Sequence, residues 1–229
     1  MEERKTGMKE KAAVFYDVDG TLVHTNILHV YVYYAMRLPK ISEKARKVLL
    51  MLLFTPLYML IDQMSRTVFN KLFYRNYKGM PEERLRILGK ELVREGLMPN
   101  VYRDAMERIK KAKKMKLTQV LVTGSLDFAM KQFAKELGID HVIANQLEMK
   151  AGIATGVLVP PILAGREKLK AMKDFAAREN VDLSRSYAFA DSKYDLEMLE
   201  AVGYPVAVNP DAGLRKIAES RGWPIVSFT

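Results

Sequence analysis

The chain has 229 residues, of which 49% are hydrophobic and 28% charged, and this composition supports a packed core and excludes wholesale disorder. The absence of cysteine excludes disulfides, thiolate metal sites and a cysteine nucleophile. The net charge of +10 favours anionic partners, such as phosphorylated substrates, acidic lipid surfaces or nucleic acid.

The first predicted strand covers residues 12–16 and runs into Asp17-Val18-Asp19-Gly20-Thr21. Because residues i and i+2 of a strand point the same way, a bend after Asp17 can aim both carboxylates at one small volume. Two such acids suit a divalent cation, or a division of nucleophile and acid/base roles. Taken alone, the Asp-x-Asp pattern is equally consistent with an acidic turn that merely ends a strand.

The segment between the first two predicted strands is too long to be a loop without structure of its own. Helical patterns cover residues 27–36, 42–54, 57–73 and 81–95. We therefore predict a helical cap over 23–97, inserted into a core formed by 1–22 and 98–229. The cap carries 13 Lys and Arg against 6 Asp and Glu, so most of the net positive charge belongs to it.

The most apolar window of the cap covers residues 48–61 and contains Pro56. With 14 residues it is shorter than the roughly 20 that span a bilayer, so a transmembrane helix is not expected. The preferred interpretation is a helix pair packed within the protein. The alternative is an apolar surface for anionic lipid headgroups, because basic residues flank the window on both sides. These residues are Lys40, Lys44, Arg46 and Lys47 before it, and Arg66, Lys71, Arg75 and Lys78 after it.

Beyond the cap, strands alternate with helices, which predicts a parallel sheet with helices on both faces. Strands are predicted at 117–122, 141–144, 187–190 and 205–208, and helices at 126–137, 168–178 and 195–201. Residues 146–159 are predicted to form a β-hairpin attached to the sheet rather than a strand of it.

Polar groups follow several of these strands at their carboxyl ends, where open parallel sheets bind ligands. Thr123 and Gly124 follow the second strand, and Asp191 and Asp195 follow the fourth. Lys168 lies at the start of the helix predicted at 168–178. Carboxylates, a hydroxyl, a backbone N–H and one ammonium together suit a phosphate held beside a divalent metal.

These motifs resemble those of haloacid dehalogenase-superfamily phosphatases, in the branch that includes phosphoserine phosphatases. Residues 17–21 correspond to the family's first motif, Thr123 to the second, Lys168 to the third, and Asp191 with Asp195 to the fourth. The four occur in the family's order, and the resemblance covers almost the whole chain. It implies a Rossmann-like α/β core, with a helical cap that closes over the substrate and sets selectivity.

The resemblance also implies the role of each residue. Asp17 would be the nucleophile that forms an aspartyl-phosphate, and Asp19 the general acid and base. Mg²⁺ would lie between the Asp17 carboxylate, the Asp19 backbone carbonyl and Asp191, and Asp195 would support the metal site. The phosphoryl oxygens would be held by Thr123, the Gly124 N–H and Lys168.

Three positions depart from the pattern of that branch. Ala190 replaces a glycine at the start of the fourth motif, a change we expect to be tolerated. Asn26 replaces an acidic residue that can pair with the substrate ammonium, and Tyr194 replaces an asparagine. The last two changes weaken the assignment of phosphoserine as the substrate.

We therefore expect a phosphate monoester of a lipid or another hydrophobic alcohol, such as lysophosphatidate or phosphatidylglycerophosphate. A small soluble metabolite such as phosphoserine is the alternative. A non-catalytic phosphate-binding regulatory module is a third hypothesis, and the intact motifs argue against it.

The remaining expectations concern partners and location. The lysine run at 110–116 indicates a solvated helix end, so no nucleic-acid partner is expected. The first residues are charged and lack the apolar run of a secretory signal. We expect a cytoplasmic protein, with peripheral contact to an anionic membrane at its inner face.

Overall fold

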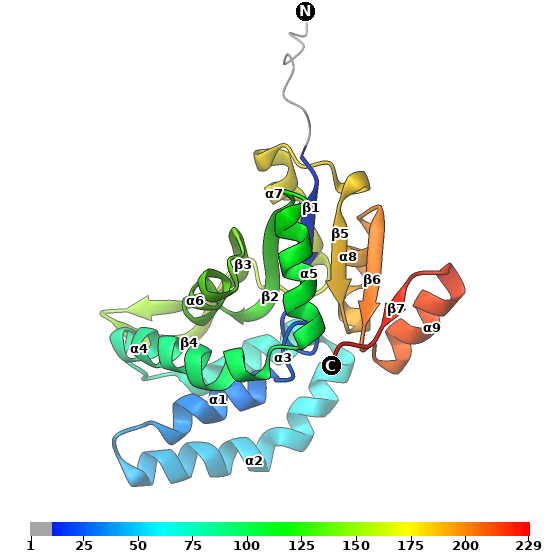
Figure 1. Cartoon of the computed structure of the whole chain (residues 1–229). Helices are drawn as coiled ribbons and strands as arrows, with labels where there is room; N and C mark the ends of the chain where they lie inside the picture. Colours follow the sequence, from blue (N-terminus) through cyan, green and yellow to red (C-terminus); the bar gives the residue numbers. More distant parts are fainter. Residues whose placement is uncertain (1–10) are drawn as a thin grey trace, which may run out of the picture.

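A computed structural model describes residues 11–229 (Figure 1). The residues that underlie the prediction of no secretory signal, at the start of the chain, lie outside this range. The strands are β1 (Ala13–Tyr16), β2 (Thr118–Leu126), β3 (His141–Lys150), β4 (Ile153–Val159), β5 (Tyr187–Ala190), β6 (Tyr204–Val208) and β7 (Ile225–Val226). The α-helices are α1 (Ile27–Met36), α2 (Ile41–Met64), α3 (Arg66–Phe73), α4 (Glu82–Leu92), α5 (Arg103–Lys114), α6 (Asp127–Leu137), α7 (Arg166–Glu179), α8 (Leu196–Glu200) and α9 (Ala212–Arg221). Short helical turns are η1 (Tyr74–Tyr77), η2 (Val93–Leu97), η3 (Met98–Asn100), η4 (Leu183–Arg185) and η5 (Lys193–Asp195).

In the described part of the chain the strands form one seven-stranded sheet in the order β4-β3-β2-β1-β5-β6-β7. Neighbouring strands are parallel except β4, which is antiparallel to β3. The central strand β1 pairs with β2 on one side and β5 on the other, so the chain order reverses beside it. Ligands bind at such a switch point, at the carboxyl ends of the strands.

Alternating side chains of β1 divide the core into two layers, because successive residues of a strand face opposite sides of the sheet. Val14 and Tyr16 pack in one cluster with residues of α5, α6 and the cap helices. Ala13 and Phe15 pack in the other with residues of α7, α8 and α9. Helices thus cover both faces of a mostly parallel sheet, which confirms the predicted α/β fold class.

The hairpin prediction was wrong in one respect. β3 is a single strand whose first half runs parallel to β2, with His141 opposite Val120. Its second half pairs antiparallel with β4, with Gln146 opposite Val159. The first arm of the hairpin is therefore also a sheet strand, because β3 extends past the end of β2.

The segment between β1 and β2 is helical, as predicted, and Figure 1 shows α1, α2 and α3 below the carboxyl ends of the central strands. The predicted break at Pro56 does not occur, and α2 continues through it to Met64. The helix ends before Ser65 instead. The Ser65 hydroxyl caps the next helix, α3, by accepting the Val68 N–H at 3.3 Å. The division into two domains stays a prediction.

The preferred interpretation of residues 48–61, packing within the protein, was wrong. Of the residues of α2, all of which are described, Met51 is the one that is buried. Leu49 and Leu53 are 66% and 67% exposed. By length and composition this helix is apolar enough to cross a membrane. The expectation that it does not span one stays a prediction.

Candidate active site

The loop after β1 places the first acid beneath the cap. Asp17 is buried. The backbone turns sharply after it, because the Val18 carbonyl accepts the N–H groups of Thr21, Leu22 and Val23 at 3.2, 2.9 and 3.2 Å. Gly20 has φ +83°, and a Cβ there would lie 2.2 Å from Asp191 Oδ2. A side chain at this position would therefore strain the backbone and displace Asp191.

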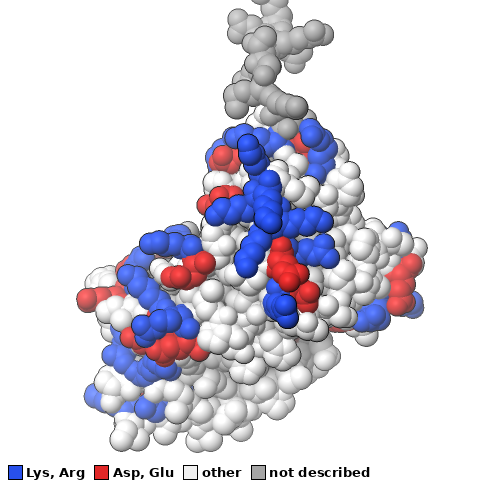
Figure 2. All heavy atoms as spheres, in the orientation of Figure 1, with Lys and Arg blue, Asp and Glu red and all other residues white. Residues whose placement is uncertain are grey.

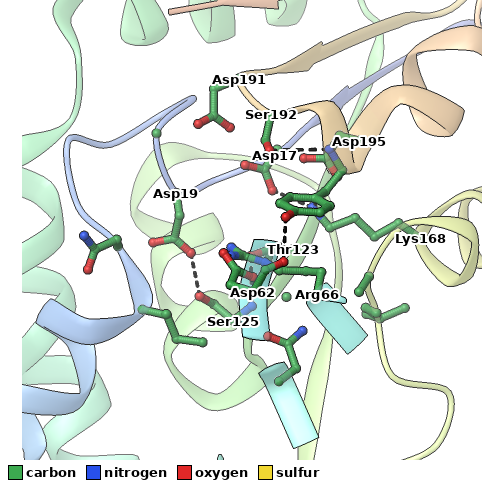
Figure 3. A pocket seen from close by; sticks show the side chains of 18 of the residues that line it. Asp17, Asp19, Asp62, Arg66, Thr123, Ser125, Lys168, Asp191, Ser192 and Asp195 are labelled. Atoms are coloured by element: carbon green, nitrogen blue, oxygen red, sulfur yellow. Dashed lines mark hydrogen bonds and ion pairs between the residues drawn. The ribbon is translucent and has the colours of Figure 1, made fainter. Parts of the chain in front are cut away.

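Three carboxylates meet at the carboxyl ends of β1 and β5. Asp17, Asp191 and Asp195 each offer an oxygen, and these oxygens lie within 4.8 Å of one another (Figure 3). β1 and β5 are adjacent and parallel, with Tyr16 opposite Phe189, so the residues that follow them are neighbours. The Thr21 hydroxyl can donate to Asp191 Oδ1, at 3.2 Å.

Lys168 joins two of these acids. It lies in the first turn of α7, and its Nζ is 2.7 Å from both Asp17 Oδ1 and Asp195 Oδ1. All three side chains are buried. Burial alone would lower the pKa of Lys168, but the adjacent carboxylates outweigh it and raise the pKa. The ammonium is therefore charged and fixes the two carboxylates in place.

The single positive charge of the Lys168 ammonium does not neutralise the three clustered carboxylates. Burial, followed by repulsion from Asp17, raises the pKa of Asp191, and burial also raises the pKa of Asp195. A divalent cation would relieve both effects, and clustered carboxylate oxygens are the hard ligands that Mg²⁺ prefers. The donor set of this site therefore fits Mg²⁺.

Asp19 lies apart from the three clustered acids. Its Oδ2 accepts the Ser125 hydroxyl at 2.8 Å. Burial, with a further contribution from Asp17, raises the pKa of Asp19 to about 6, although the bond from Ser125 acts in the opposite direction. A carboxyl with this pKa can hold or release a proton near neutral pH, as a general acid and base must.

The end of β2 supplies the opposite wall. The Thr123 hydroxyl accepts the Ser125 N–H at 3.0 Å, across an irregular part of the strand that follows Thr123. The Gly124 carbonyl accepts both the Tyr74 hydroxyl and Asn145 Nδ2, each at 2.8 Å. These bonds hold Thr123 and Gly124 rigidly in the wall of the cavity.

The structure brings together every residue that the sequence assigned to the site. Asp17, Asp19, Thr123, Gly124, Lys168, Asp191 and Asp195 all line one cavity of about 350 Å³. Their catalytic, phosphate-binding and metal-binding roles stay predictions.

The cap adds residues that sequence reasoning missed. Asp62, Arg66 and Asn70 line the same cavity, and Figure 3 shows Asp62 and Arg66 across it from Asp191. Arg66 Nη1 lies 2.7 Å from Asp62 Oδ2. Asp62 Oδ1 and Asn70 Nδ2 are buried and have no hydrogen-bond partner in the described range. The four-residue spacing of Asp62 and Arg66 is typical of any surface helix, so it gave no signal.

Two of the departures from the family pattern acquire a structural explanation. Asn26 caps α1, where its side-chain oxygen accepts the N–H groups of Leu28 at 3.0 Å and His29 at 3.2 Å. The Tyr194 hydroxyl donates to the Asp62 carbonyl at 2.5 Å, and so connects the loop after β5 to the cap.

Comparison with known proteins agrees with this geometry. Residues 14–200 match the family of haloacid dehalogenase-like hydrolases. A probable phosphatase of Mycobacterium tuberculosis is 36% identical over 151 residues, which cover 66% of this chain and 52% of that protein. The chain thus spans about half the length of this relative.

Two further comparisons concern a named activity and the fold. A phosphoserine phosphatase of M. tuberculosis is 44% identical over 95 residues, which cover 42% of this chain and 31% of that protein. A solved structure from Bordetella pertussis, of a protein of unknown function, superposes with a TM-score of 0.81. It covers 95% of this chain and 99% of its own at 22% identity, so the likeness concerns the fold.

Proposed function

The chain belongs to the haloacid dehalogenase-like hydrolase family, and from this premise we propose that it is a Mg²⁺-dependent phosphatase of phosphate monoesters. The observation that carries the proposal is the buried contact between Asp17 and Lys168, beside Asp191 and Asp195, at the switch point of the sheet. A carboxylate, an ammonium and a cation-binding cluster in one small volume are the groups that phosphoryl transfer requires.

Asp17 is the proposed nucleophile. Lys168 holds its Oδ1, and its Oδ2 has only a long contact of 3.4 Å from the Thr21 hydroxyl within the described residues. Attack forms a bond from the carboxylate to phosphorus while the bond to the leaving oxygen breaks. Asp19 gives its proton to that oxygen, and later takes a proton from the water that hydrolyses the aspartyl-phosphate.

The site would hold Mg²⁺ through Asp17, Asp191 and the Asp19 backbone carbonyl, with Asp195 in support. When bound, the cation would neutralise charge between the acids and a phosphate dianion. Lys168, Thr123 and the Gly124 N–H are proposed to hold the phosphoryl oxygens.

For the substrate we propose a phosphate monoester of a lipid or another hydrophobic alcohol. The cavity of about 350 Å³ has room for a phosphate and a small polar headgroup, but not for acyl chains as well. The chains of such a substrate would remain outside. The apolar helix α2 offers a surface for them, and its last turn carries Asp62, which lines the cavity.

A small phosphorylated metabolite such as phosphoserine is the second candidate, and the cap residues favour it. Arg66 suits a substrate carboxylate, and Asp62 Oδ1, which has no partner in the described range, suits an ammonium. The relative named phosphoserine phosphatase points the same way. A regulatory module that binds phosphate without hydrolysis is the third hypothesis, and the nucleophile would then have no function.

Hydrolysis of p-nitrophenyl phosphate, with Mg²⁺ and with EDTA, tests the reaction. We expect turnover that requires the cation, and any phosphate label trapped on Asp17 should be released by base or hydroxylamine, as from an acyl phosphate. Absence of turnover with any divalent cation would leave the regulatory module as the better explanation.

Parallel assays with lysophosphatidate micelles and with phosphoserine test the substrate class. We expect the higher kcat/KM on the lipid, and the reverse result would select the soluble metabolite. Arg66→Lys keeps the charge but loses the planar donor pair, so it should impair phosphoserine hydrolysis more than p-nitrophenyl phosphate hydrolysis if phosphoserine is the substrate.

A further inference from the structure

The outer side of α2 is an apolar surface on an otherwise charged molecule. Over residues 48–61 the sequence has no charged side chain. Eight large apolar residues of this stretch are exposed, namely Leu49, Leu50, Leu52, Leu53, Phe54, Leu57, Met59 and Leu60. A surface helix of a globular protein ordinarily turns a polar face to water, so a contiguous patch of this kind indicates a binding surface.

The inner side of the same helix is fixed to the protein. Tyr58 packs edge-on against Phe73, with ring centroids 5.7 Å apart, and Met51 is buried. Lys47 Nζ donates to the Asn76 carbonyl at 2.5 Å. A helix that crossed a bilayer would have to give up these contacts, whereas a helix that lies flat on a surface keeps all of them.

Charge at one end of the helix indicates the chemistry of the partner. Besides Lys47, whose ammonium donates to Asn76, the first turns of α2 and the residue before it carry Lys40, Lys44 and Arg46, against the single acid Glu43. Figure 2 shows basic side chains at the left margin of the lower face and an expanse without charged side chains beside them, where Figure 1 places α2. Apolar surface beside a basic cluster matches an anionic lipid leaflet, in which headgroups attract the cations and acyl chains receive the apolar side chains.

We infer that α2 is a membrane-docking helix, which lies in the plane of an anionic bilayer with residues 49–60 facing the acyl chains and the basic end among the headgroups. This specifies the element through which the membrane contact is made. It does not depend on the catalytic mechanism, so the two proposals can fail separately.

Docking would also orient the catalytic cavity. Asp62 lies in the last turn of α2 and Arg66 in the first turn of α3, and both line the cavity. The cavity therefore lies at the end of the docked helix, close to the membrane surface. A phosphorylated headgroup could enter it while its chains stay in the leaflet.

Vesicle cosedimentation tests the surface with matched variants. The parent protein should bind vesicles of phosphatidylcholine with about one third phosphatidylglycerol, and should be released as salt screens the headgroups. Leu53→Glu should weaken binding at least about tenfold, because it places a charge in the apolar face. Met115→Glu is the control, since Met115, the residue that follows the core helix α5, is 52% exposed and lies outside the surface.

A charge-reversal pair tests the basic end in the same assay. Lys40→Glu with Arg46→Glu should weaken binding to the anionic vesicles strongly, because attraction to headgroups becomes repulsion. Lys110→Glu with Lys114→Glu changes the net charge equally on α5 and should have a smaller effect. Equal effects would indicate attraction by total charge rather than by α2, and would overturn the inference.

The absence of cysteine in the chain permits clean labelling that measures the depth of the helix. An environment-sensitive dye on Leu53→Cys should shift to the blue on vesicles and be quenched from within the bilayer, whereas a dye on Met115→Cys should not. Dyes on Ile41→Cys and Met64→Cys should both remain accessible to an impermeant quencher outside the vesicles. Protection of one end would mean a transmembrane helix instead.

Two further results would reject membrane docking. The first is an absence of vesicle binding by the parent protein. The second is self-association in solution that Leu53→Glu abolishes without any lipid effect, since the surface would then bind a second copy of the chain. p-Nitrophenyl phosphate hydrolysis should persist in Leu53→Glu, which shows that the variant is folded. Binding to vesicles by a protein with no phosphatase activity would reject the proposed function alone.

Discussion

Asp17 and Asp19 are two residues apart, yet the fold gives them different surroundings. Asp17 contacts the Lys168 ammonium, whereas Asp19 accepts a neutral hydroxyl from Ser125. The Lys168 ammonium holds one oxygen of Asp17 in place for attack, whereas burial raises the pKa of Asp19 to about 6, which suits proton transfer. Two nearby acids with different partners can divide nucleophilic and acid/base work.

Asp17→Asn tests the nucleophile. The amide keeps the shape but removes the attacking charge and a cation ligand, so kcat on p-nitrophenyl phosphate should fall by at least about 10³. Circular dichroism should show an intact fold, because Lys168 retains its contact with Asp195. More than a tenth of the parent activity in this variant would exclude the covalent mechanism.

A comparison of Asp19→Asn with Asp191→Asn separates acid/base work from cation binding. Asp19→Asn keeps its backbone carbonyl, so hydrolysis should slow by roughly 10²–10⁴ with little change in the Mg²⁺ concentration for half-maximal activity. Asp191→Asn removes a carboxylate from the cluster and should raise that concentration. Equal shifts in Mg²⁺ dependence would show that the roles are assigned wrongly.

Among the elements, the loop after β5 depends on the start of α9. Asp211 Oδ1 caps α9 by accepting the Leu214 N–H at 2.7 Å. Its Oδ2 accepts the Ser192 hydroxyl and the Lys193 N–H, each at 3.0 Å. One side chain thus joins a helix end to the loop that carries two acids of the cluster.

Asp211→Ala should therefore have two effects. The loss of the cap should lower the free energy of unfolding by about 1–2 kcal/mol, measured by urea denaturation. The loosened loop should also raise the Mg²⁺ concentration needed for half-maximal activity. Asp182→Ala is the control, because Asp182 caps η4 through the Ser184 N–H at 2.9 Å and takes no part in the cavity. Destabilisation without a changed Mg²⁺ requirement in both variants would mean that Asp211 does not position the loop.

At the scale of the molecule, cation binding and folding are coupled through the buried acids. In the folded protein without a cation, the pKa of Asp19 is raised from its ordinary value of 3.8 to about 6. The pKa values of Asp191 and Asp195 are raised as well. A carboxyl whose pKa rises on folding stabilises the protein below the unfolded pKa, and this stabilisation disappears as pH rises through the folded pKa.

In EDTA, the free energy of unfolding should therefore fall by about 1–3 kcal/mol as pH rises from roughly 4 to 7. Mg²⁺ should restore stability at pH 8, where few protons compete with it for the acids, and have little effect at pH 5. Urea denaturation at each pH, with EDTA or Mg²⁺, measures both changes. In Asp19→Asn, the free energy of unfolding in EDTA should fall less as pH rises. Equal stability with and without Mg²⁺ at pH 8 would contradict a cation site.

The sequence by itself determined the core and the residues of the site. Strand and helix periods are local properties, so the order of elements and the position of the insertion could be predicted from residue patterns. The predicted site residues lie directly after strands or at a helix start, and parallel strands bring such positions to one edge of the sheet. This is why the sequence alone predicts that Asp17, Thr123 and Asp191 lie together.

The tertiary structure alone decided what surrounds these residues. Asp62, Arg66 and Asn70 come from helices without a motif, and only the packing of the cap places them in the cavity. The exposure of α2 could not be predicted from the sequence either, because an apolar window is the same in sequence whether its side chains meet a core or solvent. Which of the two applies depends on long-range packing, which fixes one side of this helix and leaves the other free.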